Sequence, residues 1–385
     1  MRVLAALLAS ALLLAPAASR AQVKLDTLDE QVRAGMAETG AKGLALAVID
    51  RGKIVSVRTW GARNAKGDPL TPDTVMYGAS LTKAVFAFTV LQLAAEKHID
   101  LDTSIATYLK KPLPDYTGVE GRYADWSGLA GDERWRKLTP RILLQHAGGF
   151  ANFGFLEPDR KLRIHFDPGT RYAYSGDGMI LLQFVLERGL GFDLGKEMQA
   201  RVFTPFGMTH TSMTWRPDFA ANLADGWKLD GSGEPHDERS KVRAAGSMDT
   251  TITDFARFAA AFMRGQGLSK AMRAEMVRPQ LPITTATQFP TFQPELPVAA
   301  RIQDLSAGLG VVTFRGPQGP GFYKGGHNDS TGNTWVCVER GKRCVVILSN
   351  DVRAEPLFPR LIRAVLGETG APWAWEYGPQ AVAGR

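Results

Sequence analysis

Apolar residues recur along the chain with two spacings, one typical of helices and the other typical of strands. Residues 25–39 carry apolar positions at helical spacing and end before a glycine. Residues 44–49 and 53–60 are two strand-like runs that meet at Arg51-Gly52, which predicts a hairpin. We therefore expect a sheet with a helix against it near the start of the folded chain.

The middle of the chain, to about residue 270, predicts helices joined by loops. The run from Ser80 to Glu96 has no helix-breaking residue. Shorter helices are expected at 142–145, 179–188 and 253–264. Five prolines between residues 279 and 297 argue against regular structure there. Beyond them we expect strands at 308–314, 334–338 and 344–348, and a helix at 356–366.

Strand-rich ends around a helical middle indicate an α/β (α+β) protein in which both ends of the chain contribute to one sheet. We assign residues 22–82 and 300–385 to a discontinuous α/β domain. Residues 83–299 form a mostly helical insert domain in this interpretation, and the functional site is expected at the junction. The segment 116–137, which contains Trp126 and Trp135, is expected to be a decorated surface loop.

The first 21 residues have the pattern of a secretory signal peptide. Arg2 supplies a positive start, an Ala- and Leu-rich run follows, and Ser19 and Ala21 place small residues before a cleavage site after Ala21. The apolar run is shorter than the roughly 20 residues that a membrane-spanning helix needs. We therefore expect a periplasmic or secreted protein without a stable membrane anchor.

Composition and charge exclude several classes of protein. With 44% hydrophobic and 22% charged residues, the chain resembles an ordinary globular protein. Its net charge of +7 falls to +5 without the first 21 residues, since 44 basic residues then stand against 39 acidic ones. No run of five basic residues occurs, so nucleic acid is not an expected partner.

The two cysteines, Cys337 and Cys344, lie at facing positions of the strand-like runs 334–338 and 344–348. With Arg340-Gly341 as the turn, the two residues fall directly opposite each other. Export permits a disulfide between them, and two buried free thiols are the alternative.

Most familiar cofactor signatures are absent from the sequence. The six histidines are not spaced as metal ligands, and neither a phosphate-binding loop nor a dinucleotide fingerprint occurs. No serine lies in a Gly-x-Ser-x-Gly sequence. We expect no metal and no organic cofactor.

Ser80-Leu81-Thr82-Lys83 begins the long predicted helix. Residues three apart on a helix share a face, so the Lys83 amine is expected to reach the Ser80 hydroxyl. A helix N-terminus also offers free N–H groups to a developing oxyanion. The alternative is that Ser80 merely caps the helix while Lys83 is a solvated charge.

Two further segments supply candidate groups. Tyr174 lies on a loop before a predicted helix, where its phenol is expected to share a proton with a lysine, although a packed core tyrosine is the alternative. The sequence from Gly325 to Gly332 begins a strand, and His327 within it is expected to face the substrate unless it is a structural histidine.

Five ordered motifs resemble the serine hydrolases that include class C β-lactamases, D-alanyl-D-alanine carboxypeptidases, D-aminopeptidases and related esterases. The motifs are Ser80-x-x-Lys83 after Thr71-Pro72-Asp73-Thr74, the stretch Leu138 to Gly149, Pro168-Gly169 with Tyr174-Ser175-Gly176, Pro205-Phe206-Gly207-Met208, and Gly326-His327. The resemblance covers nearly the whole chain after residue 21 and implies a β-lactamase/transpeptidase-like fold, an antiparallel sheet flanked by helices with an all-helical lobe.

The resemblance also implies roles. Ser80 is the expected acylated nucleophile, and Lys83 with Tyr174 is the proton-transfer pair. Backbone N–H groups of Ser80 and Ser330 are expected to hold the oxyanion, and His327 is expected where β-lactamases have the Lys of Lys-Thr-Gly. The substrate is expected to be a small molecule or short peptide, and the protein a monomer.

Three departures from the family pattern bear on the substrate. Gly176 replaces an asparagine that would bind an acylamido group, His327 replaces a permanently charged lysine, and Asp329 replaces a glycine. These changes favour an esterase or a D-amino acid peptidase or amidase over an efficient β-lactamase. A class C-like β-lactamase, a D-Ala-D-Ala carboxypeptidase and a catalytically silent binding protein stay open as alternatives.

Overall fold

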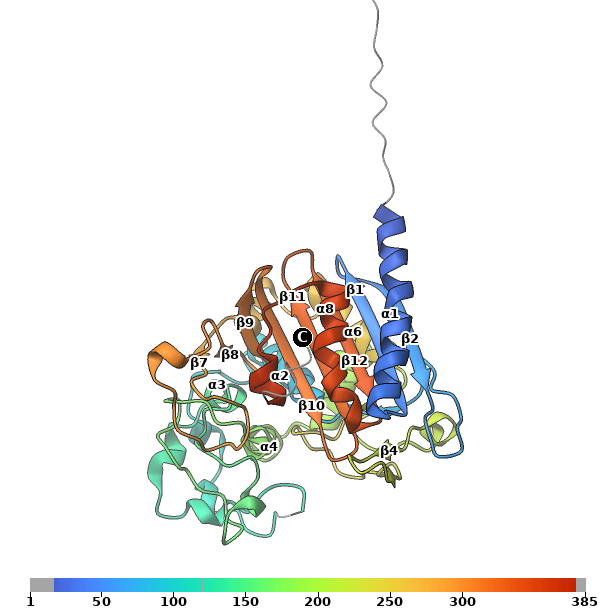
Figure 1. The fold of residues 1–385 in the computed structure, drawn as a ribbon. Coiled ribbons are helices and arrows are strands. Elements are labelled where there is room, and N and C mark those ends of the chain that lie inside the picture. The colour runs from blue at the N-terminus through green and yellow to red at the C-terminus, as the bar shows by residue number, and fades with distance from the viewer. Residues whose placement is uncertain (1–16, 120, 379–385) are drawn as a thin grey trace, which may run out of the picture.

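The computed structural model describes residues 17–119 and 121–378 and contains one eight-stranded sheet with helices on both faces (Figure 1). The two N-terminal strands lie beside strands from the C-terminal part of the chain, so both ends build the same sheet. In spatial order the strands are β2 (Lys53–Gly61), β1 (Gly43–Asp50), β12 (Arg343–Ser349), β11 (Gly332–Val338), β10 (Gly319–His327), β9 (Val312–Gly316), β8 (Ser306–Ala307) and β7 (Leu281–Pro282). Every neighbouring pair is antiparallel.

The central strands are apolar on both faces because helices cover both. On β1, Leu44, Leu46 and Val48 pack into the cluster that contains α1 (Ala17–Thr39) and α8 (Phe358–Leu366). The alternate residues Ala45, Ala47 and Ile49 pack on the other side, in the cluster that contains α6 (Ile252–Arg264) and α2 (Leu81–Ala95). Side chains alternate across a strand, so a strand buried on both sides reads as a continuous apolar run.

Helix α2 is the central helix of the protein. It is buried on nearly all sides, which agrees with its lack of a polar stripe. The segment between α2 and α6 contains short helices joined by loops: α3 (Pro140–Leu144), α4 (Gly176–Phe184) and α5 (Leu194–Met198). Two more helices follow α6, namely α7 (Lys270–Val277) and α9 (Trp373–Tyr377).

Three details differ from the sequence-based expectations. The segment 116–137 is not a surface decoration, because Trp126 and Trp135 are fully buried in the core. The strand expected at 308–314 begins only at Val312, since the N–H groups of Leu309 and Gly310 donate to helix carbonyls instead of to a neighbouring strand. The proline-rich segment contains the two-residue strand β7.

The expected signal peptide lies mostly outside the described residues. Its last five positions, 17–21, form the beginning of α1. In the part of the chain that is described, no helix combines the length and the hydropathy needed to cross a bilayer.

The two cysteines face each other as predicted, and of the two alternatives for them the structure contains the disulfide. Cys337 and Cys344 face each other across β11 and β12 and form a disulfide. Both residues are fully buried, so the bond closes the hairpin from within the core.

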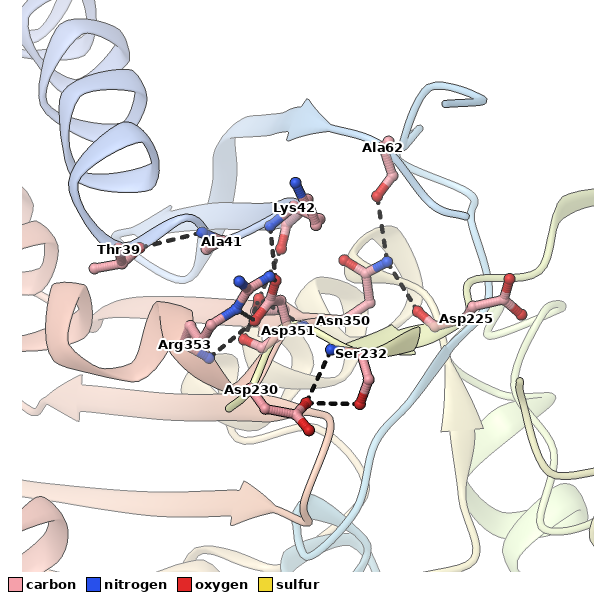
Figure 2. A network of polar contacts seen from close by, with 12 residues as sticks. Thr39, Ala41, Lys42, Ala62, Asp225, Asp230, Ser232, Asn350, Asp351 and Arg353 are labelled. Carbon is pink, nitrogen blue, oxygen red and sulfur yellow. Dashed lines mark hydrogen bonds and ion pairs between the residues drawn. The ribbon is translucent and has the colours of Figure 1, made fainter. Parts of the chain in front are cut away.

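A polar network fastens the start of β1 to the end of β12 (Figure 2). The buried Asp351 carboxylate accepts the N–H of Lys42 at 2.9 Å and pairs with Arg353 at 2.6 Å. The Asn350 amide donates to the carbonyls of Ala62 and Asp225, at 3.3 and 3.0 Å. These contacts join segments that lie far apart in the sequence.

Candidate active site

Ser80 and Lys83 lie together at the start of α2. The Lys83 Nζ atom lies 2.8 Å from the Ser80 Oγ atom and also contacts the carbonyl of Ala245. Ser80 occupies the N-cap position but makes no side-chain cap hydrogen bond, and Lys83 is 1% exposed. The capping serine and the solvated lysine are therefore both excluded as explanations of this pair.

Tyr174 stands over the same pair. The Lys83 amine lies 4.9 Å from the centre of the Tyr174 ring. The buried His146 ring stacks on the phenol, with 4.4 Å between ring centroids. The N–H of Ser175 donates to His146 Nδ1 at 3.1 Å, which fixes the backbone next to Tyr174. The tyrosine is thus held in place by packing as well as by its polar neighbours.

Lys324 on β10 is a site residue that the sequence interpretation missed. Its Nζ atom lies 3.4 Å from the Tyr174 hydroxyl and 5.1 Å from the ring centre, and the side chain is buried. Lys324-Gly325-Gly326 has the Lys-x-Gly form of the family's Lys-Thr-Gly motif. Lys324 is therefore a second candidate, besides His327, for the role of that motif's lysine, and it is the one that lies beside Tyr174.

Gly326 allows β10 to approach the nucleophile. A β-carbon at this position would lie 2.8 Å from the Leu81 nitrogen and 3.0 Å from the Ser80 nitrogen. Any side chain would push the strand away from the start of α2. The backbone of β10 at Gly326 therefore lies directly against the backbone of Ser80 and Leu81.

Of three residues expected to contact the substrate, His327 lines the cavity that contains Ser80, whereas Ser330 and Asp329 do not. The N–H of Ser330 donates to Asn328 Oδ1 at 3.0 Å, and Ser330 does not line the cavity that contains Ser80. His327 stands at the rim with a half-exposed side chain, 3.1 Å from Glu355 Oε1. Asp329 is exposed on the turn after β10 and is likewise not a lining residue. In this structure the Ser330 N–H is therefore not directed at the cavity that contains Ser80.

The phenyl ring of Phe153 fills the space that a side chain at position 176 would occupy. A β-carbon at Gly176 would lie 2.4 and 2.6 Å from two ring carbons of Phe153. The N–H of Gly176 donates to Asn152 Oδ1 at 2.9 Å. The position that carries an asparagine in the family motif is therefore occupied by a phenyl ring.

Burial and charge set the protonation of the site. Burial lowers the pKa of Lys83 well below its usual value, and the positive charge of Lys324 lowers it further. Burial lowers the pKa of Lys324 to about 8. Burial also raises the pKa of the Tyr174 phenol, and its interaction with Ser80 opposes that rise. Lys83 is therefore suited to be a neutral base, while Tyr174 stays protonated.

These groups line a cavity of about 240 Å³ between the start of α2 and the end of β10. A larger cavity of about 680 Å³ lies next to it, and the two have the wall residues Tyr77, Arg243, Gly246 and Asn328 in common. Within residues 17–119 and 121–378, no cluster of His, Cys, Asp or Glu residues is arranged to hold a metal ion. The lining instead combines a nucleophile, a base and a proton donor.

A serine activated by a buried amine, beside a tyrosine and at a helix N-terminus, defines a serine hydrolase that works through an acyl-enzyme. The family model described as Beta-lactamase matches residues 28–368. The chain belongs to this family, as the resemblance predicted.

Individual relatives agree with this assignment. A D-aminopeptidase from Brucella anthropi is 30% identical over 186 residues, which cover 48% of this chain and 35% of the relative. A lovastatin esterase from Penicillium rubens is 28% identical over 181 residues, covering 41% of this chain and 44% of the relative. The chain thus spans less than half the length of these two relatives.

A solved structure of a class C β-lactamase superposes with a TM-score of 0.71 at 16% identity, covering 92% of this chain and 98% of that chain. This likeness confirms the predicted β-lactamase/transpeptidase-like fold.

Proposed function

We propose that this hydrolase cleaves esters of a small apolar acyl group through an acyl-Ser80 intermediate. The observation that carries the proposal is the phenyl ring of Phe153 beside Gly176, where an acylamido-binding side chain would stand. Phe289 adds a second ring, 5.4 Å from that of Tyr174, on the same cavity. Aromatic walls favour an apolar acyl group over an amide, and a cavity of about 240 Å³ suits a short one.

The geometry supports the following cycle. Lys83 takes the proton of Ser80 as its Oγ atom bonds to the ester carbonyl carbon. The oxyanion develops beside the Ser80 N–H and the passing strand β10. As the ester bond breaks, Tyr174 donates its proton to the leaving alkoxide and recovers one from Lys83. Water then attacks acyl-Ser80, which releases the acid and returns the serine proton.

A hydrolysis panel tests this proposal. Purified wild type and S80A are compared on p-nitrophenyl acetate, butyrate and octanoate, a chromogenic cephalosporin, a D-Ala-D-Ala peptide and D-alanine p-nitroanilide. We expect the short esters to exceed the cephalosporin in kcat/KM by roughly 100-fold or more, because Gly176 lacks the side-chain amide with which the family motif binds the acylamido group.

S80A is expected to lose this activity. A preference for the cephalosporin, the peptide or the D-alanine amide would overturn the ester assignment and favour the alternatives named by the relatives. Binding without turnover of any substrate would instead support a catalytically silent protein.

Two further expectations are part of the proposal. The protein is exported and cleaved after Ala21, which N-terminal sequencing of the mature product from its native host checks. It is a monomer, which light scattering of the purified protein checks.

A further inference from the structure

Three hairpin turns gather at the end of the sheet that lies opposite the catalytic cavity. The Arg51 N–H in the β1–β2 turn donates to the Gly341 carbonyl in the β11–β12 turn at 2.9 Å. The β9–β10 turn lies beside them, because the N–H of Glu339 donates to the carbonyl of Pro320 at 3.0 Å. Strand β10 runs from this end to the start of α2, which it contacts at Gly326. The rise along the strand between Pro320 and Gly326, at about 3.3 Å per residue, places the turns roughly 20 Å from the nucleophile.

Positive side chains surround these turns. Arg264, at the end of α6, joins them because its Nη1 atom donates to the Gly52 carbonyl at 2.7 Å. Apart from Arg343, which is partly buried, the positive side chains are exposed. Within residues 17–119 and 121–378 none of them forms an ion pair, and we call this group the basic end: Arg51, Lys53, Arg264, Arg315, Arg340, Lys342 and Arg343.

Carboxylates do little to balance these charges. The three turns and the strand ends beside them contain two, Asp50 and Glu339. Glu339 is paired with Arg273 on α7 at 3.0 Å, so its charge is already matched. Seven cations against Asp50 alone give the basic end a charge of +6, whereas residues 22–385 as a whole carry +5. The rest of the molecule is therefore close to neutral, and the positive excess is concentrated at one end.

Two exposed apolar side chains stand beside the cations. Ile54 is 38% exposed and Val55 is 54% exposed, although aliphatic side chains of this size are usually buried. Both directly follow Lys53 on β2, which is an edge strand of the sheet. Cations next to exposed apolar side chains suit a membrane surface, because the cations meet anionic headgroups while the apolar groups enter the boundary of the acyl chains.

Nucleic acid is the other polyanion that a basic surface could bind. The chain has no run of five basic residues, and the cations of the basic end come from three separate turns and one helix end. A phosphate backbone offers nothing to the aliphatic side chains of Ile54 and Val55, whereas a bilayer does. The combination of charge and apolar exposure therefore favours lipid.

We propose that the basic end binds the surface of a bilayer that contains anionic lipid, as a peripheral and reversible contact. Each Lys or Arg near such a surface strengthens binding roughly five-fold. The catalytic cavity lies at the other end of β10, so it stays open to substrate while the basic end is bound. The proposal does not rest on the proposed function, because it concerns neither Ser80 nor its substrate.

Sedimentation with vesicles tests the proposal. The full chain is mixed with vesicles of phosphatidylcholine alone or of phosphatidylcholine with about 30% phosphatidylglycerol, at about 0.1 M salt, where the Debye length is about 10 Å. We expect the anionic vesicles to bind wild type at least ten-fold more tightly than the neutral ones. About 0.5 M salt should remove most of this difference, because it screens the headgroup charge.

Two matched variants locate the contact. R315E/R340E reverses two exposed charges of the basic end and should weaken binding to anionic vesicles by roughly 100-fold or more. K66E/K110E makes the same change of net charge at exposed lysines outside the basic end, and it should bind within about three-fold of wild type. Both variants should react with a fluorophosphonate probe at Ser80 at the wild-type rate, which checks that they are folded.

Three results would overturn the proposal. The first is equal binding of wild type to neutral and anionic vesicles, which needs no variant and so decides the matter even if R315E/R340E does not fold. The second is an equal loss of binding in the two variants, which would show that net charge and not the basic end is responsible. The third is tighter binding to a duplex DNA fragment than to anionic vesicles in the same salt, which would assign the basic end to nucleic acid. Loss of ester hydrolysis alone would count against the proposed function and leave the lipid contact intact.

Discussion

Replacing Gly176 by alanine tests whether Phe153 really fills the space beside the catalytic tyrosine. The added β-carbon would lie 2.4 Å from a Phe153 ring carbon, whereas ordinary contacts begin at 3.4 Å, so the ring must retreat by the difference, about 1.0 Å. Such overpacking costs about 1–3 kcal/mol in the free energy of unfolding. We expect G176A to be destabilised by that amount.

Gly178 offers a matched control on the same helix. A β-carbon there meets its nearest neighbours at 3.5 Å or more, which is ordinary contact. Because alanine is the better helix former, G178A should be neutral or more stable by about 0.5–1 kcal/mol. Urea unfolding followed by circular dichroism compares the two variants with wild type.

The cause of the loss is assigned by repeating the comparison in an F153A background. With the ring removed, G176A should lose less, and the coupling between positions 176 and 153 should be about 0.5–3 kcal/mol. The function should follow: F153A/G176N restores the amide of the family motif without the clash, and its preference should move from esters toward acylamido substrates. Equal losses from G176A in both backgrounds would refute the reasoning.

Three further predictions concern stability and the base. Replacing Cys337 and Cys344 by alanine should cost about 2–3 kcal/mol by loss of the loop constraint, and an unchanged urea midpoint would contradict this. Burial raises the pKa of Asp177 to about 6, so the folded state binds this proton more tightly than the unfolded state. The free energy of unfolding should therefore decrease as the pH rises from about 4 to 6, and D177N should remove about 3 kcal/mol of that decrease. An unchanged pH dependence in D177N would argue against this. K83M should slow probe labelling of the serine by roughly 100-fold or more, and near-normal labelling would exclude Lys83 as the base.

The strands that were predicted best from the sequence are those with buried apolar side chains on both faces. The runs that became β1 and β12 are almost continuously apolar, since helices cover each side of them. Strand β10 was missed because glycines interrupt its pattern. Glycine is required at these positions because Gly325 lies against the Glu376 carboxylate and Gly326 lies against the start of α2, which leaves no room for a β-carbon. A pattern of alternating apolar side chains cannot reveal a strand in which glycine is required at several positions.

The candidate site was predictable where its geometry is local. The spacing of Ser80 and Lys83 on one helix fixes their contact, so the sequence sufficed. Lys324 was missed because the direction in which its side chain points depends on strand β10, which had not been predicted. Strand alternation was the missing signal, since residues three apart in a strand point to opposite faces.

The same alternation gives the two faces of β10 different neighbours. Lys324 faces Tyr174, and Gly326 faces the Ser80 backbone. On the opposite face, Tyr323 and Gly325 lie next to Glu376, and His327 lies next to Glu355. The pairing of β9 with β10 ends at Tyr323, so the last residues of β10 have an edge free of β9 that borders the cavity. Shifting the register of β10 by one residue would exchange its faces: Lys324 would be replaced by Tyr323 or Gly325, and Gly326 by Gly325 or His327. The disulfide-closed hairpin of β11 and β12 holds the sheet next to β10, so it stabilises the register on which the site depends.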